Sequence, residues 1–423
     1  MISKAATLGL SVTLLAGTAM FAQEGSVPKG VPHLDHVFVI LMENHGFSQL
    51  VNNPNAPFIN QFAKSANSAN NYFAIAHPSL TNYLEIVGGS NFGVRTDNYP
   101  DWHNSSCSPN LATATVATDN PATGIICPIW GKGTDAATPA VDTTNEVQGT
   151  PGDNNIDGSQ SIPADPNIVG KTIADQLVAN GLSWKSYQES LPLSGADLVN
   201  YSDGVYTNNT DFTKITPALT PPLSQSDVVF AYAVKHNPFA YFRDVQEGFN
   251  PRNSLKNVVD FEGAGGLYAD LASGDVPSLS FIAPNQCNDQ HGRGNAGAFC
   301  NFDPSDVGNQ AGLNPALIYR GDVAVKRLVT AIHKSPSWHD GHNAIVLVWD
   351  ENDYSTAPNT NQVLLVVDTN YGAHHVVSNK RYDHFSLLKT IEAGFELPCL
   401  NHACDSNEHV MTDLFVGRDD DDR

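Results

Sequence analysis

The stretch HVFVILMENHGF, residues 36–47, begins as an apolar run and becomes polar within two positions. The run HVFVILM is rich in β-branched and large apolar residues, which predicts a buried strand. A carboxylate, an amide and an imidazole follow at once, as Glu43, Asn44 and His45. Because ligands of open α/β sheets bind beyond the carboxyl ends of the strands, this abrupt end predicts a working site at one edge of a sheet.

Similar apolar runs alternate with helical patterns along the rest of the chain. The predicted strands are HVFVILM (36–42), LSWKSY (182–187), LSFIAP (279–284), AIVLVWD (344–350) and QVLLVVD (362–368). The predicted helices are PFINQFAKSA (57–66), LTNYLEIVGG (80–89), IVGKTIADQLVANG (168–181), GLYADLASG (266–274) and ALIYRGDVAVKRLVTAIHKS (316–335). This alternation predicts an α/β fold, with a mostly parallel central sheet and helices on both of its faces.

Composition excludes several classes of protein. The chain has 423 residues, 41% of them hydrophobic, which is enough for one large core or for a main domain with insertions. The chain has 22 Lys and Arg residues and 44 Asp and Glu residues, so its formal net charge is −22. Such a surface repels phosphate backbones and anionic membranes, and we therefore expect no nucleic-acid partner. An anionic substrate would need a locally positive pocket.

The N-terminus has the pattern of an export signal. Lys4 precedes the apolar stretch AATLGLSVTLLAGTAMFA, and the polar QEG follows, with cleavage expected after Ala19 or Ala22. A membrane anchor is the alternative, but the stretch is shorter than the ~20 residues that a spanning helix prefers. We expect residues 1–22 to be a signal peptide, and residues 23–423 to form a single secreted or periplasmic domain without a stable membrane span.

Six cysteines fit an exported protein, because disulfides persist in oxidising compartments. Six cysteines allow 15 connectivities, but the cysteines of this chain lie in three pairs that are close in sequence. A metal site is the alternative, and no CxxC spacing supports it. We expect residues 101–167, which are rich in Asn, Thr, Ser, Gly and Pro, to form an irregular surface insertion. The disulfide nearest the N-terminus would hold this insertion in place. The expected pairs are Cys107 with Cys127, Cys287 with Cys300, and Cys399 with Cys404.

Two of the predicted strands end on oxygen ligands. Glu43 and Asn44 follow the first strand, and Asp350 and Glu351 follow the strand IVLVW. If these ends are neighbours, their carboxylates repel one another unless a cation lies between them. Ligation by oxygen alone favours Mg²⁺, Ca²⁺ or Mn²⁺ over Zn²⁺. The alternative is that each cluster merely ends its strand in a solvated turn.

The segment AHPSLTNYLEIVGG, residues 76–89, places Ser79 at the start of a predicted helix. Free backbone N–H groups and the positive end of the helix dipole gather there, and both stabilise a phosphate or an attacking alkoxide. An ordinary N-cap serine has the same sequence position. The neighbouring motifs must therefore decide between these two roles.

Histidines at strand ends or helix starts supply that context. Lys235 and His236 stand side by side in KHNPFAYF, Asp289 and His291 follow the strand LSFIAP, and His384 begins a helical pattern in YDHFSLL. A single histidine would be presumed structural. Three at such positions are less easily explained in that way.

These motifs together resemble a known family. ENHGF, HPSLTNYLEIVGG, KHNPF, PNQCNDQHG, VWDENDYS and YDHFSLLKTIEAGF occur in the order found in the phosphoesterase family. That family includes secreted acid phosphatases of bacteria and fungi and bacterial phospholipases C, and is distantly related to alkaline phosphatase. The resemblance runs from about residue 34 to about residue 400 and leaves the insertion uncovered. It implies an alkaline-phosphatase-like fold.

The resemblance also implies roles for individual residues. One divalent ion would be bound, since Glu351 stands where alkaline phosphatase has an imidazole ligand. His291, oriented by Asp289, would transfer protons, and His236 would bind phosphoryl oxygens. The implied metal ligands are Glu43, Asn44, Asp350, Glu351 and the nucleophile Ser79; the implied substrate-binding residues are Asn44, His77, Asn82, Lys235 and His384.

The expected function is that of a secreted, metal-dependent phosphomonoesterase, an acid phosphatase with a phosphoserine intermediate. The substrate would be a small phosphate ester, with a phospholipid or inositol phosphate head group as the alternative. Protonated histidines would add positive charge to the pocket at acidic pH. Two other interpretations stay open: a phospholipase C-type phosphodiesterase, and a non-catalytic, metal-stabilised binding protein on the cell surface.

Overall fold

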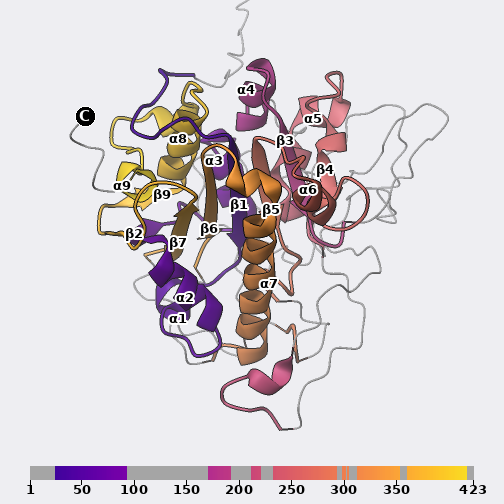
Figure 1. Ribbon diagram of the computed structural model, residues 1–423, viewed down its shortest axis with the longest axis vertical. Helices are drawn as coiled ribbons and strands as arrows, with labels where there is room; N and C mark the ends of the chain where they lie inside the picture. The colour runs from indigo at the N-terminus through magenta and orange to yellow at the C-terminus, as the bar shows by residue number, and fades with distance from the viewer. Residues whose placement is uncertain are drawn as a thin grey trace, which may run out of the picture.

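A computed structural model describes residues 24–92, 170–191, 211–220, 232–292, 298–301, 303, 312–352 and 360–416 (Figure 1). The predicted signal peptide, the insertion at 101–167 and the pair Cys107 and Cys127 lie outside these residues. Both other predicted disulfides are confirmed, Cys287 with Cys300 and Cys399 with Cys404. Within the described part of the chain, no helix has the length and apolar character needed to cross a membrane.

A nine-stranded sheet forms the centre of the molecule, in the order β4-β3-β5-β1-β6-β7-β2-β8, with β9 paired to β2. Strands β4, β3, β5, β1 and β6 are parallel, and β7 runs antiparallel to both of its neighbours. The predicted mostly parallel sheet is thus confirmed. The strands are β1 (His36–Met42), β2 (Asn67–Phe73), β3 (Trp184–Gln188), β4 (Val258–Asp260), β5 (Leu279–Ala283), β6 (Asn343–Trp349), β7 (Gln362–Thr369), β8 (Val377–Ser378) and β9 (Tyr382–Asp383).

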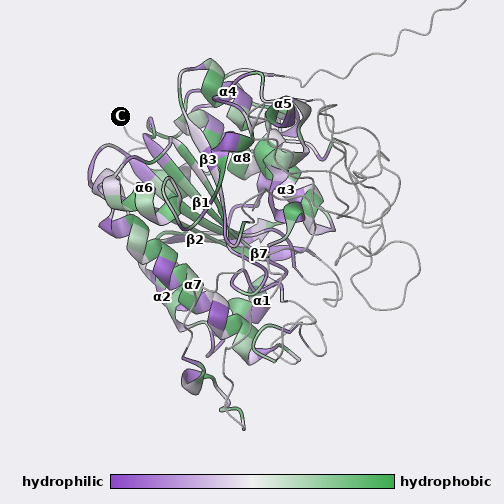
Figure 2. Ribbon diagram, turned by 90° about the vertical axis from the view of Figure 1, so that its right-hand side faces the viewer, coloured by the Kyte–Doolittle hydropathy of each residue, from purple (hydrophilic) through white to green (hydrophobic). Residues whose placement is uncertain are grey.

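Two groups of helices cover the sheet. Helices α2, α6 and α7 pack together on one face, while α3 packs with α4 and α8 on the other (Figure 2). The α-helices are α1 (Phe47–Leu50), α2 (Pro57–Ser65), α3 (Ser79–Gly88), α4 (Ile173–Ala179), α5 (Arg243–Glu247), α6 (Leu267–Ser273), α7 (Pro315–Lys334), α8 (His384–Gly394) and α9 (Thr412–Phe415). Short 3₁₀ helices are η1 (Phe212–Lys214), η2 (Val234–His236), η3 (Pro238–Tyr241), η4 (Leu255–Asn257), η5 (Pro336–His339) and η6 (Asn401–Cys404).

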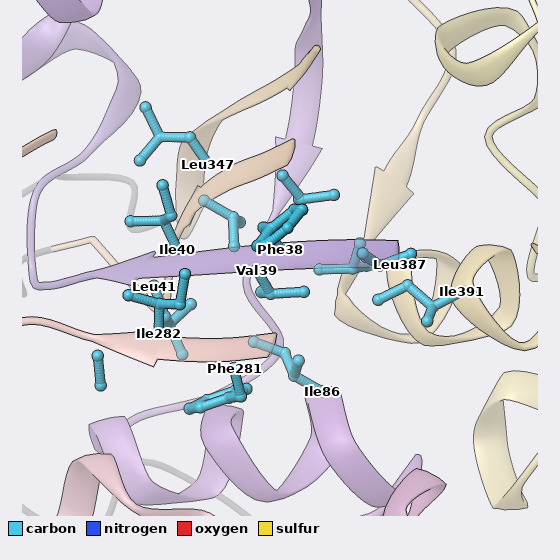
Figure 3. Packing of buried hydrophobic residues seen from close by; sticks show 14 of the residues in the cluster. Phe38, Val39, Ile40, Leu41, Ile86, Phe281, Ile282, Leu347, Leu387 and Ile391 are labelled. Carbon is cyan, nitrogen blue, oxygen red and sulfur yellow. The ribbon is translucent and has the colours of Figure 1, made fainter. Parts of the chain in front are cut away.

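Strand β1 is the middle of the core. All its residues after His36 are buried, and hydrophobic side chains from neighbouring strands and from α3 and α8 surround it (Figure 3). Ile86 comes from α3, Leu387 from α8 and Leu347 from β6. Each such side chain contributes about 1.5–3 kcal/mol when it is fully buried. This packing fixes β1, and with it the position of the polar residues that follow.

Helix α3 ends at a glycine that no other residue replaces easily. Gly89, the C-cap, has φ 67°, and its N–H donates to Glu85 O. A Cβ atom built there would lie 2.3 Å from Leu400 O. Gly181 also has a positive φ, 81°, but a Cβ there meets nothing within 4 Å.

We expect Gly89→Ala to lower the free energy of unfolding more than Gly181→Ala does. Both substitutions place a Cβ in the left-handed region, at a cost of about 1–2 kcal/mol. Only Gly89→Ala must also displace the main chain at Leu400. Denaturant unfolding of the two variants measures the difference. Equal losses of stability would show that this close approach does not constrain α3.

Candidate functional site

The two acidic strand ends are neighbours, which is the condition on which the predicted cation site depends. Strands β1 and β6 pair in parallel up to Met42 and Trp349, so the next residues, Glu43 and Asp350, lie side by side. Asp350 N donates to Met42 O over 2.9 Å, and Asn44 N donates to Asp350 Oδ1 over 3.2 Å. The solvated-turn alternative is wrong, because Glu43, Asp350 and Glu351 are all completely buried.

The Ser79 hydroxyl points into this acidic cluster. Its Oγ lies 3.0 Å from Glu43 Oε2, 3.3 Å from Glu351 Oε1 and 3.4 Å from Asn44 Oδ1. A hydroxyl has one proton to donate, so it satisfies one of these three oxygens at a time. All three oxygens surround this one hydroxyl, which is the environment that a hard cation stabilises.

Ser79 is not an N-cap. Helix α3 begins at Ser79 itself, the N-cap is Pro78, and no side chain caps this end. The hydroxyl therefore lies in the first turn of a ten-residue helix, beside its free N–H groups. The capping alternative is excluded by this geometry, and Ser79 keeps the position expected of a nucleophile.

Asn82 and His77 contact the protein around this cluster. Asn82 Oδ1 accepts from the main-chain N–H groups of Ile75 and Ala76 over 3.1 and 3.0 Å. Its Nδ2 donates to Ala76 O and, over 3.2 Å, to Glu351 Oε2. His77 Nδ1 lies 2.7 Å from the same Glu351 oxygen. Both residues were predicted to bind substrate, and the contacts described here fix Glu351 and the turn before α3.

A second group of side chains meets Glu43 from the other side. His236 Nε2 lies 3.1 Å from Glu43 Oε1, and its Nδ1 lies 3.2 Å from Asp289 Oδ2. The His236 ring stacks on Tyr83, with ring centroids 5.2 Å apart. Tyr83 OH donates to Glu43 Oε1. The two oxygens of Glu43 thus face different partners: Oε2 faces Ser79, and Oε1 faces Tyr83 and His236.

Lys235 and His291 form a buried pair. Lys235 Nζ lies 3.1 Å from His291 Nε2, and His291 Nδ1 lies 2.8 Å from Gly292 O. An ammonium only donates and a carbonyl only accepts, so the His291 ring is neutral with its proton on Nδ1. Asp289 Oδ1 accepts from His291 N over 2.7 Å. Asp289 therefore orients the main chain of His291 and the ring of His236.

Burial dominates the electrostatics of the site. It raises the pKa of the Glu43 carboxyl well above its ordinary value, and Asp350 raises it further. The pKa values of Asp350 and Asp289 are raised in the same way, by burial first and then by Glu351 and Glu43 respectively. Burial, followed by Lys235, lowers the pKa of His236. In the absence of a cation, these acids cannot all be ionised together.

The chain offers two donor sets for a cation, and Glu43 belongs to both. The oxygen set is the predicted one, and within it Asp350 Oδ2 is buried without a hydrogen-bond partner among the described residues. The second set brings ligand atoms of Glu43, His236 and His291 within 4.8 Å of one another. Its nitrogen donors suit Zn²⁺ as well as other transition metals. The residues present thus fit a divalent ion, whose identity stays a prediction.

His384 lies behind the site. Its Nε2 contacts Asp350 O at 2.6 Å, and its Nδ1 contacts Tyr72 OH at 2.9 Å. Burial lowers its pKa to about 4, so the ring is neutral near pH 7. Both ring nitrogens contact the protein, and His384 supports the main chain of Asp350. Its contact with substrate stays a prediction.

Two tyrosines that contact the site, Tyr83 and Tyr72, were not predicted from the sequence. Tyr83 lies four residues after Ser79 on α3, which is the spacing that puts two side chains on one helix face. That spacing could have identified it. Tyr72 lies on β2, a strand whose polar sequence gave no signal.

Comparisons with known proteins identify the family of the chain. The model of the Phosphoesterase family matches residues 51–299. A phosphatidylinositol-3-phosphatase of Mycobacterium tuberculosis is 22% identical over 414 residues, covering 96% of this chain and 92% of the relative. An acid phosphatase of Aspergillus fumigatus is 24% identical over 52% of this chain and 29% of its own length. A phosphate-repressible acid phosphatase of Penicillium chrysogenum is 23% identical over 86% of this chain and 60% of its own length.

The chain thus spans less than two thirds of these fungal relatives. Among solved structures, an alkaline phosphatase superfamily protein of Vibrio parahaemolyticus aligns with a TM-score of 0.39 at 12% identity, over 90% of this chain and 72% of the other. The family model covers more than half of the chain. The chain belongs to the phosphoesterase family and is a hydrolase of phosphoric esters.

Proposed function

We propose that the protein is a metal-dependent phosphomonoesterase, an acid phosphatase that acts through a phosphoserine intermediate. One observation carries this proposal: a buried hydroxyl at a helix start, Ser79, lies within 3.4 Å of three donor oxygens from two strand ends. The names of the relatives, acid phosphatases and a phosphatidylinositol-3-phosphatase, favour monoesters over diesters. A phosphorylated inositol lipid is therefore one candidate substrate.

In this proposal the ion is held by the predicted oxygen set. When bound, a divalent ion lowers the pKa of a ligating hydroxyl and neutralises charge on phosphoryl oxygens. The orphan oxygen of Asp350 and the crowded hydroxyl of Ser79 support this position. The proposed ligands are Glu43, Asn44, Ser79, Asp350 and Glu351.

The first chemical step is attack of Ser79 Oγ on phosphorus. The new Oγ–P bond forms as the bond from phosphorus to the ester oxygen breaks, and the Ser79 proton passes to a neighbouring carboxylate. Glu43 Oε2, 3.0 Å away, is the nearest acceptor. The N–H groups in the first turn of α3 lie beside the oxygens that gain charge.

The departing alkoxide must receive a proton, and we assign that step to the pair of Lys235 and His291. Lys235 donates to His291 Nε2, so the pair holds a mobile proton inside the site. In the second step, water attacks phosphorus, the Oγ–P bond breaks, phosphate leaves and the Ser79 oxygen takes its proton back from Glu43. The same pair, having lost one proton, accepts one from the water.

His236 has a different role in this proposal from the one that the resemblance implied. Both of its nitrogens face carboxylates, Glu43 and Asp289, so it fixes Glu43 and does not contact the phosphoryl oxygens in this arrangement. His236 is thus a positioning residue. Lys235 takes over the electrostatic role, because it is the buried cation beside His291.

We also propose that residues 23–423 form one exported domain that carries the insertion at 101–167. The disulfides Cys287–Cys300 and Cys399–Cys404 support an oxidising compartment. Removal of the leader after Ala19 or Ala22 is part of this proposal.

Replacing Ser79 by alanine should abolish turnover. We expect hydrolysis of p-nitrophenyl phosphate to fall by about 10³-fold or more, the scale seen when a covalent nucleophile is lost. When a reaction with ³²P-labelled substrate is quenched with acid, the wild type should carry the label on Ser79. The Ser79→Ala variant should carry none. Ser335→Ala is the control, because Ser335 is also buried but bonds Ser337 instead of the acidic cluster. Labelling of Ser79→Ala to the same level would exclude the phosphoserine mechanism.

Chelation followed by metal add-back tests both the ion and the type of ester. We expect EDTA to abolish activity and one divalent ion to restore it, because the buried carboxylates need a counter-charge. Hydrolysis is compared for p-nitrophenyl phosphate, phosphatidylinositol 3-phosphate and p-nitrophenyl phosphorylcholine. Preference for the phosphorylcholine diester would instead support a phospholipase C, and full activity in EDTA would exclude the metal.

Tyr83→Phe should weaken activity without unfolding the protein. The variant keeps the ring on His236 but loses the hydrogen bond to Glu43. A hydrogen bond to a charged group contributes about 1.5–3 kcal/mol, so we expect kcat/KM to fall roughly 10- to 100-fold. The control is Tyr187→Phe, which removes a comparable bond to Asp270. That control should lose stability only, and an equal loss of activity in both variants would contradict the proposed role.

A further inference from the structure

A cavity lies away from the acidic site, between the segment that precedes β1 and the helix α8. Its volume is about 540 Å³, and none of the residues of the acidic site lines it. Pockets for small molecules are typically about 300–1,000 Å³. In Figure 1 the indigo segment that leads into β1 passes α8, which carries one wall of this cavity.

The charge of this cavity is opposite to that of the chain. Three lysines line it, Lys29, Lys380 and Lys389, against one carboxylate, Glu408. The whole chain has a net charge of −22 and only 22 Lys and Arg. Three lysines around one cavity therefore form a local positive patch, to which anions are drawn although the surrounding surface repels them.

Two of these lysines form no short-range ion pair with a carboxylate among the described residues. Lys389 Nζ donates to the main-chain carbonyls of Asp405 and Glu408 over 3.1 and 3.0 Å, and these acceptors carry no net charge. Lys29 makes no hydrogen bond or ion pair with any described residue and is exposed. Lys380 pairs with Asp413 over 3.5 Å, with 65% of its side chain exposed, so that pair is weak.

The wall that carries Lys29 is fixed to the body of the protein. Gly25 N donates to Cys399 O over 2.9 Å, and Cys399 N donates to Ser26 O over 3.2 Å. Cys399 is itself bonded to Cys404. The segment is thus held against a disulfide-closed turn, and Lys29 lies only a few residues beyond this attachment.

Glu408 loses its charge at acidic pH. Burial first, and then its hydrogen bond with Asp383, raise the pKa of Glu408 to about 7, while Ser386 and Lys389 on α8 lower it. Asn407 Nδ2 also donates to Glu408, and His409 lines the cavity beside it. Below that pKa the lining has three lysines and no ionised carboxylate, so the attraction for anions grows as the pH falls.

We propose that this cavity is an anion-binding site, separate from the acidic site, for a small molecule that carries phosphate or sulfate groups. Lys29, from the segment before β1, and Lys389, from α8, supply its positive charge. Tyr382 lines the same cavity, and its hydroxyl donates to Asp413 over 2.6 Å. The proposal is independent of the chemistry proposed for Ser79.

The test measures sulfate binding to the full chain by isothermal titration calorimetry. Sulfate stays dianionic across the working pH range, so its pH dependence reports on the protein alone. We expect Lys29→Gln to weaken binding roughly three- to tenfold, the scale of one charge-assisted contact at an exposed site. Lys256→Gln is the matched control, because it removes the same charge from an exposed lysine at η4, beside the opposite edge of the sheet.

Further variants separate this site from the catalytic one. Ser79→Ala should bind sulfate at this cavity as the wild type does, and Lys29→Gln should keep the wild-type hydrolytic rate. Lys389→Gln should also weaken binding, and its thermal unfolding is compared because it loses two hydrogen bonds. Unchanged sulfate affinity in both lysine variants would overturn the proposal.

The source of the anion is distinguished with vesicles. Phosphatidylcholine vesicles with and without phosphatidic acid are floated with the wild type and with Lys29→Gln. Flotation that needs both phosphatidic acid and Lys29 assigns a lipid head group, while sulfate binding without flotation assigns a soluble anion. Crystals soaked in selenate locate the site directly through the anomalous signal of selenium. A lack of anomalous density between Lys29 and Lys389 would count against the proposal.

Discussion

The parallel register of β1 and β6 is the constraint on which the rest of the site depends. These strands pair residue by residue from His36 with Asn343 to Met42 with Trp349, so Glu43 and Asp350 must leave the sheet together. A shift of one residue would turn every side chain of β1 to the other face of the sheet, which its hydrophobic surroundings do not permit. Hydrophobic packing along the strand thus forces two carboxyl groups into contact at its end.

A second layer of polar contacts keeps these acids in place. His384, at the start of α8, contacts the main chain of Asp350, and Asn82 on α3 donates to Glu351. Helices α3 and α8 also pack against each other on the same face of the sheet. The acidic cluster is therefore supported by the helices that bury β1, so loss of that packing would disturb the site before any ligand residue is changed. Residues outside the first contact with substrate often determine geometry in this way.

The sequence predicts the parts of this fold that have a strong periodic pattern. All five apolar runs form strands and all five helical patterns form helices, although α4 is shorter than expected because its capping box begins at Thr172. Strand β2, NSANNYF, has no apolar alternation and is defined only by its pairing with β7, β8 and β9. The antiparallel direction of β7 and the contacts of His384 likewise depend on tertiary packing, which a linear pattern does not encode.

Glu43 joins the two halves of the site, and this arrangement has a physical consequence. Its Oε2 lies beside Ser79, while its Oε1 accepts from Tyr83 and lies beside His236. His236 in turn contacts Asp289, which holds the main chain of His291. The hydroxyl and the Lys235–His291 pair are thus connected through a single carboxylate. Groups that share a partner at this distance do not contribute additively, so the energies of the two halves cannot be assigned separately. A cation on either side of Glu43 would change the charge felt on the other.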